Sequence, residues 1–155
     1  MSEPFARRAT PDDADRLTAL ARAAYARHVA AIGREPMPMA ANWAKLVSEQ
    51  EVWIVDGPAG EAVASLALDM HADHVMIWSV AVAPAHQRHG LGRRLMVLAE
   101  TRARVLGRPE LRLFTNARME GNIALYRRLG YTETQREQLT DRVLVHMSKA
   151  VDAGG

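Results

Sequence analysis

The stretch at residues 74–82 (HVMIWSVAV) constrains the fold most, because nearly every position after the first is apolar. Such a run predicts a strand that is buried on both faces in the middle of a sheet. Apolar side chains then recur with helical spacing over residues 91–106, and a further strand is predicted at 111–115. Strand, helix and strand in this order require a right-handed crossover, so the two strands are expected to be parallel.

The remaining segments predict antiparallel strands and short helices around this unit. Thr10 and Pro11 are typical of a helix start, and Gly57 and Gly60 separate two β-rich runs that predict a hairpin. The expected helices lie at 10–31, 39–47 and 122–129, and the expected strands at 51–56, 62–70, 131–135 and 142–149. The chain is therefore expected to be an α/β domain with a mixed, mostly antiparallel sheet of about six or seven strands and about four helices.

Composition and charge limit the classes of function. A chain of 155 residues is the size of one domain, which we assign to residues 1–150, with a frayed tail at 151–155. The net charge of +2 gives no reason to expect a nucleic-acid partner. The absence of cysteine excludes a thiol nucleophile, and His71 with His74 alone does not predict a metal site. No signal peptide or membrane-spanning stretch is recognisable, so we expect a cytoplasmic protein without a membrane partner.

A glycine-containing segment lies between the predicted central strand and the long helix. It consists of Gln87, Arg88, His89, Gly90, Leu91 and Gly92, and Arg93 follows it. The unpaired N–H groups and the dipole of a helix start favour an anion, and glycine lets a diphosphate approach the backbone. The dinucleotide fingerprint and the Walker loop are both excluded, because their further glycine and their Gly-Lys-Ser/Thr are absent. By itself the segment is equally consistent with a tight turn.

Two motifs together carry a resemblance to a known family. Gln87, Gly90 and Gly92 meet the pattern Gln/Arg-x-x-Gly-x-Gly/Ala, and the chain resembles the GNAT superfamily of acetyl-CoA-dependent N-acetyltransferases. Residues of a second family segment follow in order, with a shorter interval before the tyrosine than in its strict form: Asn122, Ala124, Tyr126, Gly130 and Tyr131. The resemblance covers residues 51–131 well. It implies a GNAT-like sheet that splays between the strands at 74–82 and 111–115.

The resemblance also implies acetyl-CoA as a co-substrate and assigns residues to it. The arm of CoA would pair with the central strand, and its diphosphate would lie on the amides of the glycine-containing segment. The implied cofactor-binding residues are Val80, Ala81, Val82, Gln87, Arg88, His89, Gly90, Leu91, Gly92, Arg93 and Asn122. The implied catalytic residue is Tyr126, whose phenol would donate to the departing thiolate. Taken alone, Tyr126 is more typical of a core tyrosine than of a catalytic one, and Asn122 is also consistent with a helix N-cap.

The implied reaction is direct transfer of an acetyl group to a primary amine of a small molecule or a peptide. The alternative is a non-catalytic acyl-CoA-binding or regulatory module, because the strand at 74–82 carries no Asp or Glu that could act as a base. The base stays open among four candidates: Asp69, His71, Ser79 and Glu35. In related folds the acceptor pocket is shaped by the region of Tyr25, His28 and Arg34, and a homodimer is an expectation from the fold alone.

Overall fold

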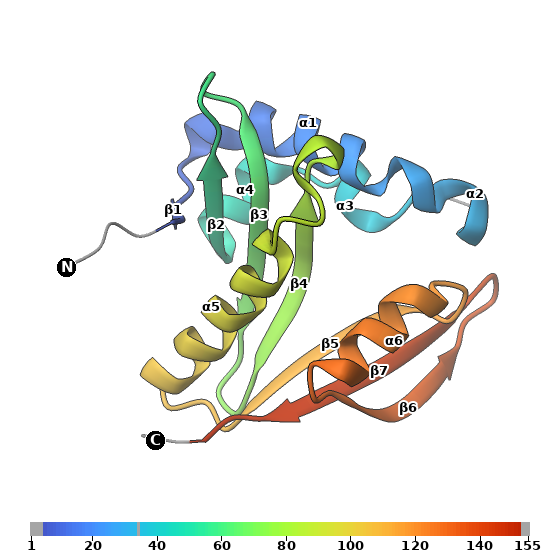
Figure 1. The fold of residues 1–155 in the computed structure, drawn as a ribbon. Coiled ribbons are helices and arrows are strands. Elements are labelled where there is room, and N and C mark those ends of the chain that lie inside the picture. The colour runs from blue at the N-terminus through green and yellow to red at the C-terminus, as the bar shows by residue number, and fades with distance from the viewer. Residues whose placement is uncertain (1–4, 34, 153–155) are drawn as a thin grey trace.

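The computed structural model describes residues 5–33 and 35–152. In this part of the chain seven strands form one sheet in the order β1-β2-β3-β4-β5-β7-β6 (Figure 1). Their bounds are β1 Arg7–Arg8, β2 Glu51–Asp56, β3 Ala62–Met70, β4 Val75–Val82, β5 Glu110–Asn116, β6 Thr132–Gln138 and β7 Val143–Ala150. β4 and β5 are parallel, and every other neighbouring pair is antiparallel. The mixed sheet, the hairpin of β2 and β3 and the central place of β4 are confirmed.

Four helices precede β2 in the described part of the chain, and two more follow β4 and β5. The bounds are α1 Ala14–Tyr25, α2 Val29–Ile32, α3 Met37–Ala40, α4 Trp43–Glu49, α5 Leu91–Val105 and α6 Glu120–Arg128. A 3-10 turn at Ala26–His28 separates α1 from α2, where the sequence predicted one helix. The helix expected at 39–47 is in fact two helices. Ala41 is extended, and the Asn42 side chain caps α4 by accepting a hydrogen bond from the Lys45 amide at 3.1 Å.

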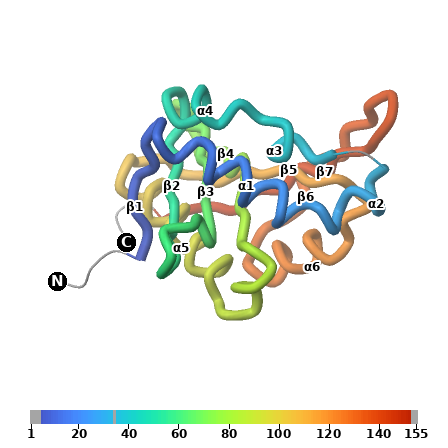
Figure 2. Tube along the Cα trace, turned by 90° about the horizontal axis from the view of Figure 1, so that it is seen from above, coloured from blue at the N-terminus to red at the C-terminus, as the bar shows by residue number. Residues whose placement is uncertain are grey.

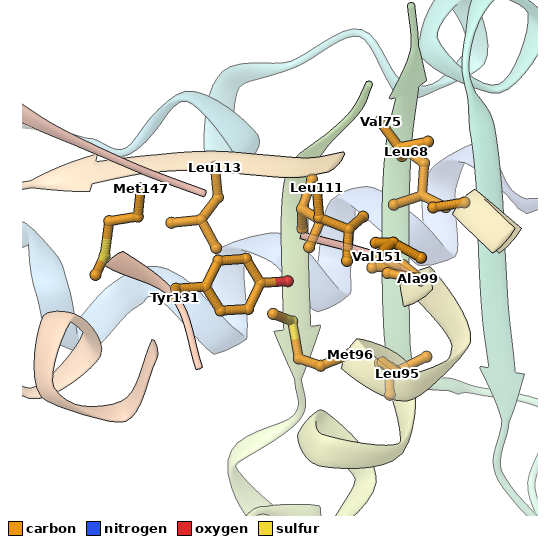
Figure 3. Close-up of a cluster of buried hydrophobic side chains, with 14 of the residues drawn as sticks. Leu68, Val75, Leu95, Met96, Ala99, Leu111, Leu113, Tyr131, Met147 and Val151 are labelled. Carbon is orange, nitrogen blue, oxygen red and sulfur yellow. The ribbon is translucent and has the colours of Figure 1, made fainter. Parts of the chain in front are cut away.

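The helices cover both faces of the sheet. Figure 2 shows α4 on one side and α5 and α6 on the other. On the α4 side, Leu17 and Leu20 of α1 pack with Trp43 against β2 and β3. On the other side, Leu95 and Ala99 of α5 join a larger core, part of which is drawn in Figure 3. Each fully buried leucine contributes about 1.5–3 kcal/mol, so these contacts hold α1 and α5 firmly against the strands beside β4.

β4 differs from the strand that the sequence predicted. Its positions alternate between buried and half-buried instead of being buried on both faces. β5 is paired with β4 only at Val75 and Met76, and the two strands then diverge, as Figure 1 shows. A β-bulge at Trp78 also interrupts the pairing of β4 with β3. The second half of β4 is therefore open on the side that faces β5.

A buried carboxylate ties β1 to the start of the first helical segment. The Asp13 side chain is 1% exposed, and the Arg7 guanidinium donates to both of its oxygens at 3.0 Å. Arg16 also donates to Asp13, and the Thr10 amide donates to it at 2.8 Å. The hydrogen bonds from Arg7 are the main reason why the pKa of Asp13 lies well below its usual range, against the opposing effect of burial.

We expect Asp13→Asn to lower the free energy of unfolding at pH 7 by about 1.5–3 kcal/mol, the usual worth of hydrogen bonds to a charged group. Because folding lowers the pKa of Asp13, its ionic stabilisation is complete above the unfolded pKa of about 3.9 and is lost as the pH falls through the folded value. Urea unfolding at pH 7 and pH 3 measures this. The difference between wild type and variant should shrink at pH 3, and an unchanged difference would contradict the ion-pair account.

The end of the described chain and the histidine pair both have local partners. Val151 is buried and its amide donates to the Pro109 carbonyl at 2.9 Å, whereas residues 153–155 of the expected frayed tail lie outside the described residues. The rings of His71 and His74 stack at 4.4 Å, and each is hydrogen-bonded to a neighbouring aspartate. Within the described ranges, no helix is long and apolar enough to cross a membrane.

Candidate active site

The turn between β4 and α5 has an unusual backbone conformation. Arg88 and Gly90 both have positive φ, at 69° and 82°. Glycine adopts this region without a steric penalty, whereas arginine does so at a cost of about 1–3 kcal/mol. Such strain persists only where the surroundings enforce it, and it is often found at binding sites. The first α-helical hydrogen bond after the turn runs from the Arg94 amide to the Gly90 carbonyl at 3.0 Å.

The backbone amides of residues 88–93 have no carbonyl or side-chain partner within the described part of the chain. They lie at the N-terminus of α5, where the partial positive charge of the helix adds to their own. A cavity of about 390 Å³ opens beside them, between the turn, the second half of β4 and α6. Every residue that the resemblance assigned to acetyl-CoA or to catalysis lines this cavity, except His89.

The edge of β4 that faces the cavity carries free donors. The Ala83 amide donates to the Val63 carbonyl of β3 at 2.8 Å, and bonded positions alternate along an antiparallel pair. The backbone groups of Val80 and Val82 therefore face away from β3, and β5 does not reach them. Their carbonyls accept side-chain hydrogen bonds, from the Tyr25 hydroxyl to Val80 at 2.9 Å and from the Gln87 amide to Val82 at 3.1 Å. The N–H groups of Val80 and Val82 have no hydrogen-bond partner among the described residues.

Gln87 also connects the turn to the first helical segment. Its side-chain oxygen accepts a hydrogen bond from Arg27 at 2.7 Å, while its amide nitrogen donates to the Val82 carbonyl. The residue thus fixes the turn to β4 and to the 3-10 segment at the end of α1. No sequence pattern indicated the part that Arg27 takes, because a basic residue near a helix end is usually only solvated.

Asn122 and Tyr126 come from α6 and lie one helical turn apart on the same face. Met119, and not Asn122, is the N-cap of this helix, so the capping interpretation of Asn122 is wrong. Tyr126 is half-buried and its ring lies 6.0 Å from that of Tyr131. Burial is the main cause that raises the pKa of Tyr126 above its usual value, and the Tyr25 phenol adds to the shift. Tyr126 is therefore a neutral hydrogen-bond donor at physiological pH.

A second cavity of about 130 Å³ adjoins the first. Four residues line both cavities: Tyr25, Val80, Asn122 and Tyr126. The Tyr25 hydroxyl, besides its bond to Val80, lies 3.0 Å from the Ser79 hydroxyl, so α1 holds the strand at the junction. His28 lines the larger cavity, and Arg34 lies outside the described residues.

The four candidates for a base are separated by the fold. Glu35 and Ser79 line the smaller cavity. Asp69 and His71 lie at the β3–β4 hairpin, bonded to each other at 3.2 Å, and line neither cavity. The smaller cavity also contains Phe114 and Leu144, which sequence reasoning did not single out because strands far apart in the chain bring them there.

Comparison with known protein families identifies the family to which this chain belongs. A profile described as "Acetyltransferase (GNAT) family" matches residues 16–131, more than half of the chain. The chain belongs to the GNAT acetyltransferase family. Members of this family are N-acetyltransferases, so the expected family, fold and enzyme class are confirmed.

Solved structures of GNAT proteins are similar to this one. A nourseothricin acetyltransferase has 25% identity and a TM-score of 0.61, and the match covers 67% of this chain and 66% of that chain, so this chain spans just under two thirds of its length. A GCN5-related N-acetyltransferase from Rhodopseudomonas palustris has 21% identity and a TM-score of 0.78 over 97% and 98% of the chains. The PaiA N-acetyltransferase from Thermoplasma acidophilum, solved in complex with coenzyme A, has 17% identity and a TM-score of 0.75 over 97% and 99%.

Proposed function

We propose that this GNAT protein transfers the acetyl group of acetyl-CoA directly to a primary amine of a small molecule or a peptide. The observation that carries the proposal is the position of Tyr126 at the junction of two cavities, one beside the glycine-containing turn and one lined by β4, β5 and the segment 35–38. Acetyl-CoA in the larger cavity would place its thioester at this junction, and the acceptor amine would reach the thioester from the smaller cavity. Residues 1–150 would act as one catalytic domain.

The larger cavity fits the chemistry of CoA. Free amides at residues 88–93 and the start of α5 suit a diphosphate, and Arg88 and Arg93 line the same cavity and add positive charge. The free N–H groups of Val80 and Val82 suit the amide carbonyls of the pantetheine arm. The same fold holds coenzyme A in the Thermoplasma acidophilum protein, which supports this assignment.

The residues at the junction have distinct roles in this mechanism. The amine nitrogen attacks the thioester carbonyl carbon, and a free N–H of the β4 edge, near Val82, stabilises the oxyanion. As the carbon–sulfur bond breaks, the Tyr126 hydroxyl donates a hydrogen bond to the developing thiolate. Because burial raises the pKa of this phenol further above that of a thiol, about 8.5, the hydrogen bond is favoured over complete proton transfer. The catalysis rests mainly on proximity and oxyanion stabilisation.

The proposal is tested by measuring binding and turnover separately. Acetyl-CoA should raise the melting temperature, whereas acetyl-pantetheine, which lacks the diphosphate, should bind at least about tenfold more weakly, because hydrogen bonds to a charged group are lost. Thiol release from acetyl-CoA should then depend on an added primary amine. Stabilisation by acetyl-CoA without any amine-dependent thiol release would instead support the acyl-CoA-binding module.

A further inference from the structure

We propose that the acceptor of this protein is a primary amine that carries an apolar group the size of a benzene ring, and that this group occupies the smaller cavity. The inference rests on the proposed function and narrows its acceptor. It depends on the size, the lining and the charge of that cavity.

The size of the smaller cavity sets the size of its occupant. Its volume is about 130 Å³. An apolar protein cavity of about 150 Å³ holds one benzene molecule, so one six-membered ring fills this space and a bicyclic ring system exceeds it. A methyl or ethyl group would leave most of the volume to water.

The lining of the smaller cavity is largely apolar. The splayed strands β4 and β5 contribute Trp78 and Phe114, and β7 contributes Leu144. Met37, the first residue of α3, also lines the cavity. Met37 is 49% exposed, so it offers apolar surface that a ligand in this cavity could cover. Covering these surfaces with an apolar group of the acceptor removes them from water and favours binding in proportion to the area buried.

The charges around the smaller cavity favour a cation. Of the described residues that line it, Glu35 is the only acid and Arg142 the only base. Nη1 of Arg142 is 2.9 Å from Oδ1 of Asp141, so its charge is already offset. Glu35 makes no ion pair or hydrogen bond within the described part of the chain. An amine arriving as ammonium therefore meets the Glu35 carboxylate, which has no partner among the described residues and can attract the amine and accept its proton before the attack.

The reaction on such an acceptor is balanced without any other reagent. The ammonium gives one proton to the Glu35 carboxylate, directly or through water, and the free amine forms the new carbon–nitrogen bond. The carbon–sulfur bond breaks, and the thiolate accepts a hydrogen bond from Tyr126. The nitrogen loses a second proton as the amide forms, and one proton passes through solvent to the departing thiolate.

The experiment compares 2-phenylethylamine with ethylamine, which have the same reacting group, in a thiol-release assay of the whole protein. We expect kcat/KM to be at least about tenfold higher for 2-phenylethylamine, because a ring-sized apolar surface is buried. Leu144→Trp, which fills the cavity, should bring this ratio toward one, because it lowers kcat/KM for 2-phenylethylamine more than kcat/KM for ethylamine. Phe114→Ala, which enlarges the cavity, should raise kcat/KM for 2-(1-naphthyl)ethylamine relative to 2-phenylethylamine.

Glu35→Gln tests the charge. It should raise the KM of both amines about threefold or more, whereas Glu49→Gln, at an exposed acid that lines neither cavity, should not. Equal kcat/KM for the two amines in the wild type, or a ratio that neither cavity variant changes, would overturn the inference. If acetyl-CoA binds and ethylamine is acetylated with the same kcat/KM as 2-phenylethylamine, the inference fails while the proposed function stands. If acetyl-CoA gives no thermal stabilisation and no amine releases thiol, both fail.

Discussion

Replacing Tyr126 with phenylalanine should lower kcat about 100-fold, the lower end of the usual contribution of a positioned donor, while the KM for acetyl-CoA changes by less than about twofold. The phenol lies at the junction of the two cavities, and it is kept neutral by burial, which raises its pKa. Its hydrogen bond strengthens only as negative charge develops on sulfur, so its loss affects turnover more than binding. Initial rates of thiol release at saturating amine measure the change.

Tyr131→Phe is the matched control for this prediction. Tyr131 is 3% exposed, lies next to Tyr126, and its hydroxyl has no hydrogen-bond partner in the described part of the chain. Figure 3 shows this hydroxyl directed into the core near Leu111 and Met96. Removing an unsatisfied buried hydroxyl is neutral or stabilising, so both kcat and KM should stay unchanged. Equal losses from the two variants, or an unchanged kcat in Tyr126→Phe, would show that Tyr126 is only a core residue.

Gly90→Val should weaken acetyl-CoA binding about 10- to 100-fold. A φ of 82° is strained for any side chain and most of all for a β-branched one, so the turn must change its conformation to accept valine. The amides of the turn then point away from the diphosphate, and each lost hydrogen bond to a charged group is worth about 1.5–3 kcal/mol. Isothermal titration with acetyl-CoA measures the affinity.

Gly107→Val is the control that separates a loss of acetyl-CoA affinity at the turn from a general loss of stability caused by valine at a positive φ. Gly107 follows the other end of α5 with a φ of 70°, and, as at Gly90, an added Cβ would meet no atom within 4 Å. Both variants should lose a similar part of their stability, about 1–3 kcal/mol, but Gly107→Val should bind acetyl-CoA normally, because it lines neither cavity. Equal binding by the two variants would remove the turn from the proposed CoA site.

Six of the seven strands were predictable because each carries its own signal, whereas the two-residue strand β1 was not predicted. The run at 51–56 and the run at 62–70 correspond residue by residue to β2 and β3, and the crossover through α5 required the parallel pair. Helix boundaries before β2 were not predictable, since the break at Ala41 depends on a side-chain cap and on packing of Trp43. The local composition of residues 39–47 could not show that this segment forms parts of two helices instead of one.

The candidate site divides in the same way. The glycine-containing turn is contiguous in sequence, so its residues could be assigned from their local pattern, and all but His89 line the larger cavity. The smaller cavity is lined by residues from segments far apart in the chain, namely α1, α2, α3, β4, β5, α6 and β7. No periodicity connects Tyr25 with Ser79 or Trp78 with Leu144. The sequence alone therefore could not show which of the candidate bases line the smaller cavity.

The sequence by itself determined the order along the chain of six strands and the two helices after β4, the parallel pair and the glycine-containing turn, because hydrophobic periodicity and glycine act over a few neighbouring residues. Only the tertiary structure decided how far β4 and β5 separate, which backbone groups of β4 remain free, and that Tyr126 lies between two cavities. Those properties depend on a β-bulge, on the short pairing of β4 with β5 and on packing between distant segments. These interactions form only when the chain has folded, so no local sequence pattern indicates them.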